Sequence, residues 1–208
     1  MEFSTLRLKH LEIILSQLSP HPNPNPQLEE YTIDSKSAKN LIYIAEFVHE
    51  DIYNKKVVDL GCGTGQLSIA AALFGASLVV GVDINKENIS LARDNTKTVG
   101  VTVEYVVGDI ESISGRFDTT ITNPPFGCWN RGADVSFLKK AIEISDVVYS
   151  LHKRSASNRK FLSRTIASLG GELDEIHEMD ITIPHTFTFH RKKKYNVSGD
   201  LYRTITTS

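Results

Sequence analysis

The 208-residue chain contains only two cysteines and no long apolar run. Cys62 and Cys128 are too few for a disulfide framework or a four-ligand zinc site, so we expect no metal site, and free thiols suit a reducing compartment. No run of about 18 apolar residues could span a bilayer, and the N-terminus lacks the pattern of a secretion signal. These absences predict a cytoplasmic protein that does not enter a membrane.

The chain also lacks an excess of one charge. Its formal net charge is -2, from 23 basic and 25 acidic residues, which argues against a disordered chain and against a polycation. Apolar residues make up 40% of the chain, which suits one globular core at this length. Any nucleic-acid surface must therefore depend on a local cluster of positive charge.

Leucines recur at helical spacing near the N-terminus and predict an amphipathic helix over residues 2–19. The proline-rich stretch 21–26 then ends this helix. We interpret residues 1–26 as a helix and a stiff spacer appended to a domain of residues 27–208. A second helix is expected over residues 34–49. Its buried residues would be Leu41, Ile42, Ala45 and Val48.

From residue 56, short apolar segments alternate with helical ones, which is typical of βαβ units and of a parallel sheet covered on both faces. The expected strands are 57–60, 78–82, 103–107, 119–121 and 147–151. After a helix over 159–169, the segments 176–183, 186–190 and 200–206 are β-rich without a helix between them. We expect these to be antiparallel strands that close the sheet edge.

A glycine-rich turn follows the first expected strand. Gly61, Gly63 and Gly65 lie between that strand and a helix expected over 66–74. Glycines let a ligand approach the backbone closely, and the free N–H groups at a helix start favour a carboxylate or phosphate. Either a dinucleotide or the amino-acid end of S-adenosylmethionine would fit this turn.

Two acidic residues follow the next two strands. Asp83 ends the second strand, where a carboxylate can accept hydrogen bonds from ribose hydroxyls. Asp109 ends the third strand, where it could bind an adenine amino group or cap a turn. Together with the glycine turn, Asp83 predicts a ligand that carries a ribose.

The most specific motif is Asn123-Pro124-Pro125-Phe126, at the carboxyl end of the fourth strand. It resembles the N-P-P-[FYW] motif of S-adenosylmethionine-dependent amino-methyltransferases. An adenine N6 amine is a poor nucleophile because its lone pair is delocalised into the ring. The Asn123 side-chain oxygen and the Pro124 carbonyl can accept its hydrogens and turn the lone pair toward a methyl group, while the prolines hold that carbonyl in place. Phe126 offers a stacking face for the base.

With these motifs in view, the chain resembles the methyltransferase-like-five family of archaeal and eukaryotic rRNA N6-adenine methyltransferases over almost its whole length. The stretches that carry the resemblance are 28–31, 59–65, 123–127, 148–153 and 189–193. It implies an α/β class I methyltransferase fold, with a mostly parallel seven-stranded sheet and an antiparallel C-terminal edge strand. It also implies S-adenosyl-L-methionine as cofactor and one adenosine of small-subunit rRNA as target. The eukaryotic members are stabilised by a small zinc-binding activator subunit, which is a candidate partner here.

The resemblance also assigns site residues. The expected cofactor-binding residues are Glu30, Ile33, Gly61, Gly63, Thr64, Gln66, Asp83, Ile84, Asp109 and Ile110. Asn123 to Phe126 would hold the target base. The family usually reads L-E-Q-Y-x-T before its first core helix, with the Gln and Thr near the cofactor, whereas this chain has Glu30 and Ile33 at those places.

One dense basic cluster lies near the C-terminus, and beside a base-modifying site it predicts contacts to phosphates. Lys153 and Arg154 would extend the same surface, and Trp129 and Arg131 could form a substrate lid. The expected RNA-binding residues of the basic cluster are His190, Arg191, Lys192, Lys193 and Lys194.

Other functions stay open at this point. A protein glutamine N5-methyltransferase uses an N-P-P-Y motif on a planar amide, and an adenine methyltransferase could act on DNA. A nicotinamide-dependent oxidoreductase would use the glycine turn and Asp83 but leaves the Asn-Pro-Pro-Phe motif unexplained. A catalytically silent RNA-binding subunit is the fourth alternative.

Overall fold

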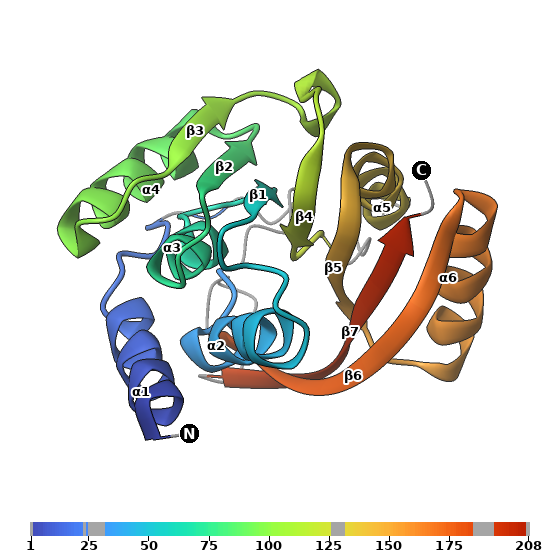
Figure 1. Cartoon of the computed structure of the whole chain (residues 1–208), viewed down its shortest axis with the longest axis horizontal. Coiled ribbons are helices and arrows are strands. Elements are labelled where there is room, and N and C mark those ends of the chain that lie inside the picture. The colour runs from blue at the N-terminus through green and yellow to red at the C-terminus, as the bar shows by residue number, and fades with distance from the viewer. Residues whose placement is uncertain (1, 23, 25–31, 126–131, 185–193, 207–208) are drawn as a thin grey trace.

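The computed structural model describes residues 2–22, 24, 32–125, 132–184 and 194–206. Its centre is a seven-stranded sheet with the order β3-β2-β1-β4-β5-β7-β6 (Figure 1). The strands are β1 (Lys56–Leu60), β2 (Leu78–Asp83), β3 (Glu104–Val107), β4 (Phe117–Thr122), β5 (Ser145–Lys153), β6 (Gly171–Pro184) and β7 (Lys194–Thr206). The first five strands pair in parallel. The expected mostly parallel α/β sheet is confirmed.

The expected antiparallel strands that close this end of the sheet are confirmed, and the structure adds their order, β5-β7-β6. β7 pairs antiparallel with both β5 and β6, so the edge of the sheet is β6. The C-terminal strand therefore lies one position inside the edge, where both of its sides are hydrogen-bonded. The strand expected over 186–190 falls outside the described residues.

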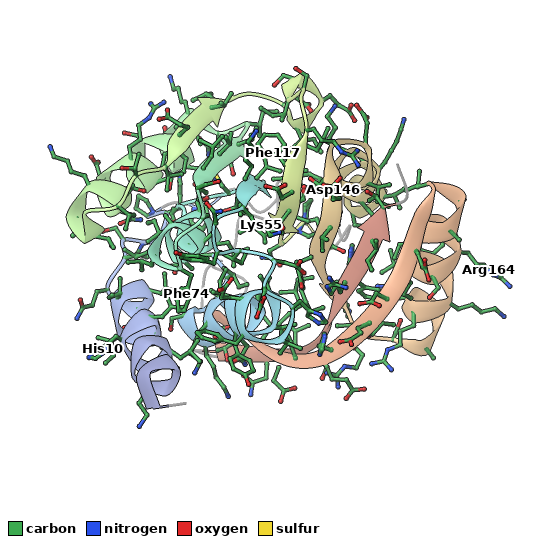
Figure 2. The ribbon with its side chains drawn as sticks, in the orientation of Figure 1. His10, Lys55, Phe74, Phe117, Asp146 and Arg164 are labelled. Atoms are coloured by element: carbon green, nitrogen blue, oxygen red, sulfur yellow. The ribbon has the colours of Figure 1, made fainter. Side chains whose placement is uncertain are left out.

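Helices cover both faces of the sheet (Figure 1). They are α1 (Glu2–Ser16), α2 (Ser35–Tyr43) with the π-helical turn η2 (Ile44–Val48), α3 (Gln66–Leu73), α4 (Lys86–Val99), the 3₁₀ turn η3 (Ile110–Ser112), α5 (Ala133–Ile144) and α6 (Ala156–Ser168). Val57 packs into the core with α1, α2 and α3, whereas Val58 and Leu60 pack into the core with α5 and α6. Figure 2 shows side chains filling both layers, with Phe74 and Phe117 among the buried ones. Within the described ranges, every helix is too short or too polar to cross a membrane.

The N-terminal helix belongs to the core, so our expectation of an appendage is wrong. Leu11 and Leu15 are each 1% exposed and lie in the same apolar cluster as the sheet. The Leu15 carbonyl accepts a hydrogen bond from Nε2 of Gln66, and the Ser19 backbone exchanges two hydrogen bonds with the Asn95 side chain. The apolar stripe of α1 is thus buried against α2 and α3.

The second helix begins as expected and ends differently. Asp34 caps α2 by accepting from the Ser37 amide, and Ala45 is fully buried, as predicted. The chain then winds into the wider turn η2, which changes the phase of the helix. Val48, which we expected in the core, is therefore 51% exposed.

Candidate functional site

A cavity of about 290 Å³ opens at the carboxyl ends of β1, β2 and β4. This is the edge at which open α/β sheets bind their ligands. The expected site residues that line it are Ile33, Gly61, Gly63, Thr64, Gln66, Asp83, Ile84, Asp109, Ile110, Asn123 and Pro125. Pro124 is buried beside the cavity without lining it, and Glu30 and Phe126 lie outside the described residues.

The glycine turn is held in a conformation that needs glycine. Gly61 has a φ of +71°, and a Cβ atom there would lie 2.8 Å from Cε1 of Phe137, itself a wall of the cavity. The amides of Gly61 and Cys62 both donate to the Val82 carbonyl at 2.9 Å. The turn is thereby tied to the end of β2, with its backbone open to the cavity.

Asp83 joins the glycine turn to the second strand. Its Oδ2 accepts from the Gly63 amide at 2.8 Å, and its Oδ1 accepts from the Asn85 amide at 2.8 Å and from Nδ2 of Asn88 at 3.3 Å. The residue also lines the cavity. Asp83 thus orders the turn and also faces the cavity.

Asp109 combines the two interpretations that we left open. Its Oδ1 accepts from the Glu111 amide at 3.0 Å and caps η3. The residue also lines the cavity beside Ile110, which is 8% exposed. Because the carboxylate of Asp109 is held by the cap of η3, its position at the cavity wall is fixed.

The cavity also contains an acidic residue that sequence analysis missed. Asp59 is 1% exposed, and its Oδ2 accepts from Oγ of Ser68 at 2.6 Å. Burial raises the pKa of Asp59 to about 7, although the hydrogen bond from Ser68 acts in the opposite direction. A charged residue inside an otherwise apolar strand was the available signal.

Four side-chain oxygen atoms in the cavity wall are buried and have no hydrogen-bond partner among the described residues. They are Oδ1 of Asp59, Oγ1 of Thr64, Oε1 of Gln66 and Oδ1 of Asn123. Such atoms are uncommon in folded proteins, because an unpaired buried polar group costs about 1–3 kcal/mol. The wall therefore fits a ligand with several polar groups, and S-adenosylmethionine, with its amino acid, ribose and adenine, is of this kind.

Several further residues reach the cavity only through the tertiary structure. His21 comes from the proline-rich stretch, Asn88 from α4 and Phe137 from α5. The N-terminal segment expected to act as a spacer thus contributes a wall of the site. A search for motifs could not find these residues, because none belongs to a pattern of fixed spacing.

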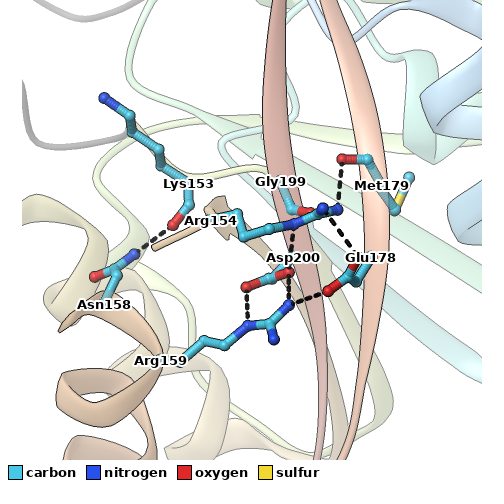
Figure 3. Close-up of polar contacts among 8 residues, drawn as sticks. All are labelled: Lys153, Arg154, Asn158, Arg159, Glu178, Met179, Gly199 and Asp200. Carbon is cyan, nitrogen blue, oxygen red and sulfur yellow. Dashed lines mark hydrogen bonds and ion pairs between the residues drawn. The ribbon is translucent and has the colours of Figure 1, made fainter. Parts of the chain in front are cut away.

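The expected RNA-binding residues are only partly described. Arg154 faces inward: its guanidinium donates to Asp200 at 3.0 Å and to the carbonyls of Met179 and Gly199, and it pairs with Glu178 at 3.0 Å (Figure 3). Lys153, by contrast, is exposed, and its side chain points away from this cluster (Figure 3). Lys194 is the first residue of β7. The other expected residues, Trp129, Arg131 and His190 to Lys193, lie outside the described ranges.

Comparisons with known proteins identify the family of this chain. The family model described as the methyltransferase small domain matches residues 36–144. The rRNA N(6)-adenosine-methyltransferase METTL5 of Danio rerio is 36% identical over 205 residues, covering 95% of this chain and 98% of its own. The Mettl5 enzyme of Drosophila melanogaster is 33% identical over 206 residues, covering 95% and 96%.

A solved structure shows that the similarity extends to the fold. The crystal structure of PH1948 from Pyrococcus horikoshii superposes with a TM-score of 0.90 and 37% sequence identity, over 97% of this chain and 98% of that one. Sequence and fold therefore match over nearly the full length of these relatives. The chain belongs to the METTL5 family of methyltransferases, built on the methyltransferase small domain.

Proposed function

We propose that this protein transfers a methyl group from S-adenosyl-L-methionine to the N6 amine of an adenosine in small-subunit ribosomal RNA. The observation that carries the proposal is Oδ1 of Asn123, a buried acceptor in the cavity wall with no hydrogen-bond partner among the described residues. The names of the full-length relatives from Danio rerio and Drosophila melanogaster support adenosine N6 as the target.

The cavity walls divide into parts that suit the cofactor. Asp83 would accept hydrogen bonds from the ribose hydroxyls, and the open backbone of the glycine turn would receive the amino-acid end. Asp109 and Ile110 would hold the adenine, one by a hydrogen bond and the other by apolar contact. When bound, the cofactor supplies an electrophilic methyl group on a sulfonium.

Asn123 and the prolines after it would act on the target amine. Oδ1 of Asn123 and the Pro124 carbonyl would accept the two N6 hydrogens, drawing the nitrogen toward tetrahedral geometry. Acceptors that are already fixed stabilise developing charge without reorganisation, and removing one such partner typically costs about 10²–10³-fold in rate. Phe126 would stack on the base, and the proton left on the nitrogen would pass to water after transfer.

An RNA surface would surround this opening. The basic residues His190 to Lys194 and the exposed Lys153 would contact phosphates, which dominate affinity for nucleic acid. Trp129 and Arg131 would cover the bound base. A small zinc-binding activator subunit and a cytoplasmic location stay predictions from the resemblance and from the free thiols.

The runner-up substrates are a protein glutamine and an adenine in DNA. A glutamine amide would use the same two acceptors, so the cavity alone does not favour one planar nitrogen over the other. The adenosine substrate is favoured because the rRNA enzymes match over about 95% of this chain and nearly all of their own length.

The test is methylation of defined substrates by the purified chain with isotope-labelled S-adenosylmethionine. We expect label in N6-methyladenosine when nucleosides of treated small-subunit rRNA are separated by mass spectrometry. Ribosomal protein, large-subunit rRNA and DNA of the same sequence serve as parallel substrates. Label in protein glutamine or in DNA alone would contradict the proposal, as would rRNA that stays unlabelled beside an active Danio rerio enzyme.

A further inference from the structure

Two histidines and a glutamate from distant parts of the sequence meet on the sheet edge, away from the methyltransferase cavity. His49 directly follows η2, whereas Glu175 and His177 lie on β6. Oε2 of Glu175 is 2.7 Å from Nε2 of His177 and 3.4 Å from Nε2 of His49. One potential ligand atom from each of the three residues lies within 4.8 Å of the other two, so three metal-binding groups share one small volume.

An irregularity in β6 creates this arrangement. The register between β6 and β7 shifts between Leu173 and Glu175, which leaves Asp174 as an extra residue. Side chains alternate between faces along a regular strand, but here Leu173 and Ile176 both pack into the core beneath α5 and α6. Glu175 and His177 therefore share the opposite face, toward η2. β-bulges often re-aim a side chain in this way at functional sites.

The imidazole nitrogens that converge here are buried and are not hydrogen-bonded. Nε2 of His49 and Nε2 of His177 have no hydrogen-bond partner in the described part of the chain. Oε2 of Glu175 lies near both nitrogens without making a hydrogen bond to either. Buried nitrogens of this kind are uncommon, and an ion between the three groups would satisfy both at once.

The surrounding charges favour a cation. Arg203 pairs with Asp51 at 3.0 Å and also with Asp174, which leaves one net negative charge on those three side chains. Glu175 adds another negative charge beside them. The His49 ring packs at 6.4 Å from the ring of Tyr149, whose hydroxyl donates to Asp51 at 2.6 Å. A bound dication would balance this local excess of negative charge.

We propose that His49, Glu175 and His177 bind a divalent first-row transition-metal ion, with zinc as the physiological ion. Two imidazoles and a carboxylate are ligands that zinc accepts, with bonds of about 2.0–2.2 Å, which place the ligand atoms of one ion about 3–4 Å apart. Water completes the coordination. The ion ties the end of η2 to β6 and so holds the α2 layer against the sheet edge, separately from methyl transfer.

The test uses the full chain without a histidine tag, stripped of metal by a chelator and titrated with Co²⁺. We expect one Co²⁺ per chain, with the visible absorption of a four- or five-coordinate ion, displaced by Zn²⁺, and a thermal midpoint that rises with metal. The double variant His49→Ala/His177→Ala should bind Co²⁺ at least about 100-fold more weakly. His10→Ala is the matched control, because this histidine is exposed on α1 (Figure 2).

A milder variant keeps the test informative if the double variant unfolds. Glu175 is exposed, so Glu175→Gln should preserve the fold, while the loss of its charge should weaken Co²⁺ binding at least about tenfold. The proposal is overturned if wild type binds no Co²⁺ at about 0.1 mM, or if wild type and Glu175→Gln bind it equally. The three side chains would then be a polar cluster that binds no metal.

Discussion

The Gly63 amide donates a 2.8 Å hydrogen bond to Oδ2 of Asp83, which links the glycine turn to the acidic end of the second strand. Two motifs that sequence analysis treated as separate binding elements are therefore one hydrogen-bonded unit. A substitution at Asp83 should therefore affect both the proposed ribose contact and the conformation of the turn.

Asp83→Ala should weaken S-adenosylmethionine binding by tenfold or more, which corresponds to about 1.4 kcal/mol or above. The change removes the proposed ribose acceptor and the hydrogen-bond partner of the Gly63 amide at the same time. Isothermal titration calorimetry measures the effect, with Asp94→Ala as a control at an exposed position of α4. Equal affinities for the two variants would remove Asp83 from the cofactor site.

Asn123→Ala should leave the fold and the cofactor affinity nearly unchanged, while methyl transfer falls by about 10²-fold or more. In the proposed mechanism its side-chain oxygen acts only when the amine nitrogen changes geometry. Phe126→Ala should differ, because a stacking face lost from the bound base also weakens RNA binding. Single-turnover methylation at saturating cofactor separates the two. A rate for Asn123→Ala within a few-fold of wild type would show that the motif is structural.

Asp59 should make the stability of the cofactor-free protein depend on pH. Burial raises its pKa from 3.8 to about 7, so the folded state holds a proton that the unfolded state releases. The resulting stability is present below about pH 4 and is lost as pH rises through 7. Between pH 5 and pH 8 this loss amounts to about 2–3 kcal/mol, and Asp59→Asn should remove it. Urea unfolding at both pH values provides the measurement; parallel pH profiles for the two proteins would contradict the assignment.

His152 should make the protein less stable as the pH falls, which is the opposite of the effect of Asp59. It is 2% exposed, and burial lowers its pKa from 6.5 to about 4. The unfolded state therefore takes up a proton first, and stability present above pH 6.5 is lost as pH falls toward 4. The cost between pH 7 and pH 5 is about 2 kcal/mol. His152→Phe keeps a ring against Tyr202 and should flatten this part of the profile, whereas the exposed control His10→Ala should not.

Lys153 and Arg154 are neighbours in sequence but should respond differently to alanine. Lys153→Ala should leave stability unchanged. It should also make RNA binding less dependent on salt, because one lost phosphate contact reduces the slope of log affinity against log salt concentration by about 0.7–0.9. Arg154→Ala should cost about 1–3 kcal/mol of stability, because the fully buried Asp200 loses one of its two arginine partners. Chemical unfolding and filter binding across salt concentrations measure both. An unchanged salt slope for Lys153→Ala would place it outside the RNA surface.

Much of the fold was predictable because it depends on local patterns. Strands buried on both faces need continuous apolar residues, so β1 and β2 were found within a residue or two of their ends. The glycine turn, Asp83 and Asn123 each follow a strand, and parallel strands bring their carboxyl ends to one edge of the sheet. The expected cavity residues were therefore predicted to lie close together before their geometry was known.

The errors concern contacts between distant segments. An amphipathic helix shows which of its faces is apolar without showing what covers it, so α1 was taken for an appendage although Leu11 and Leu15 lie in the core. The phase of η2 depends on one extra residue in a turn, which exposes Val48. A buried ion pair depends on which side chains meet, so Arg154 could not be distinguished from Lys153 by its neighbours in sequence.

The sequence by itself determined the sheet, the glycine turn, the methyltransferase motif and the family, because these depend on residue types at fixed spacing along the chain. Only the tertiary structure decided that His21 and Phe137 enclose the cavity, that Asp59 is buried with a raised pKa, and that His49 meets His177. Burial, electrostatics and ligand geometry depend on distances through space. Packing sets those distances, and the separation of two residues in the sequence does not predict whether they meet.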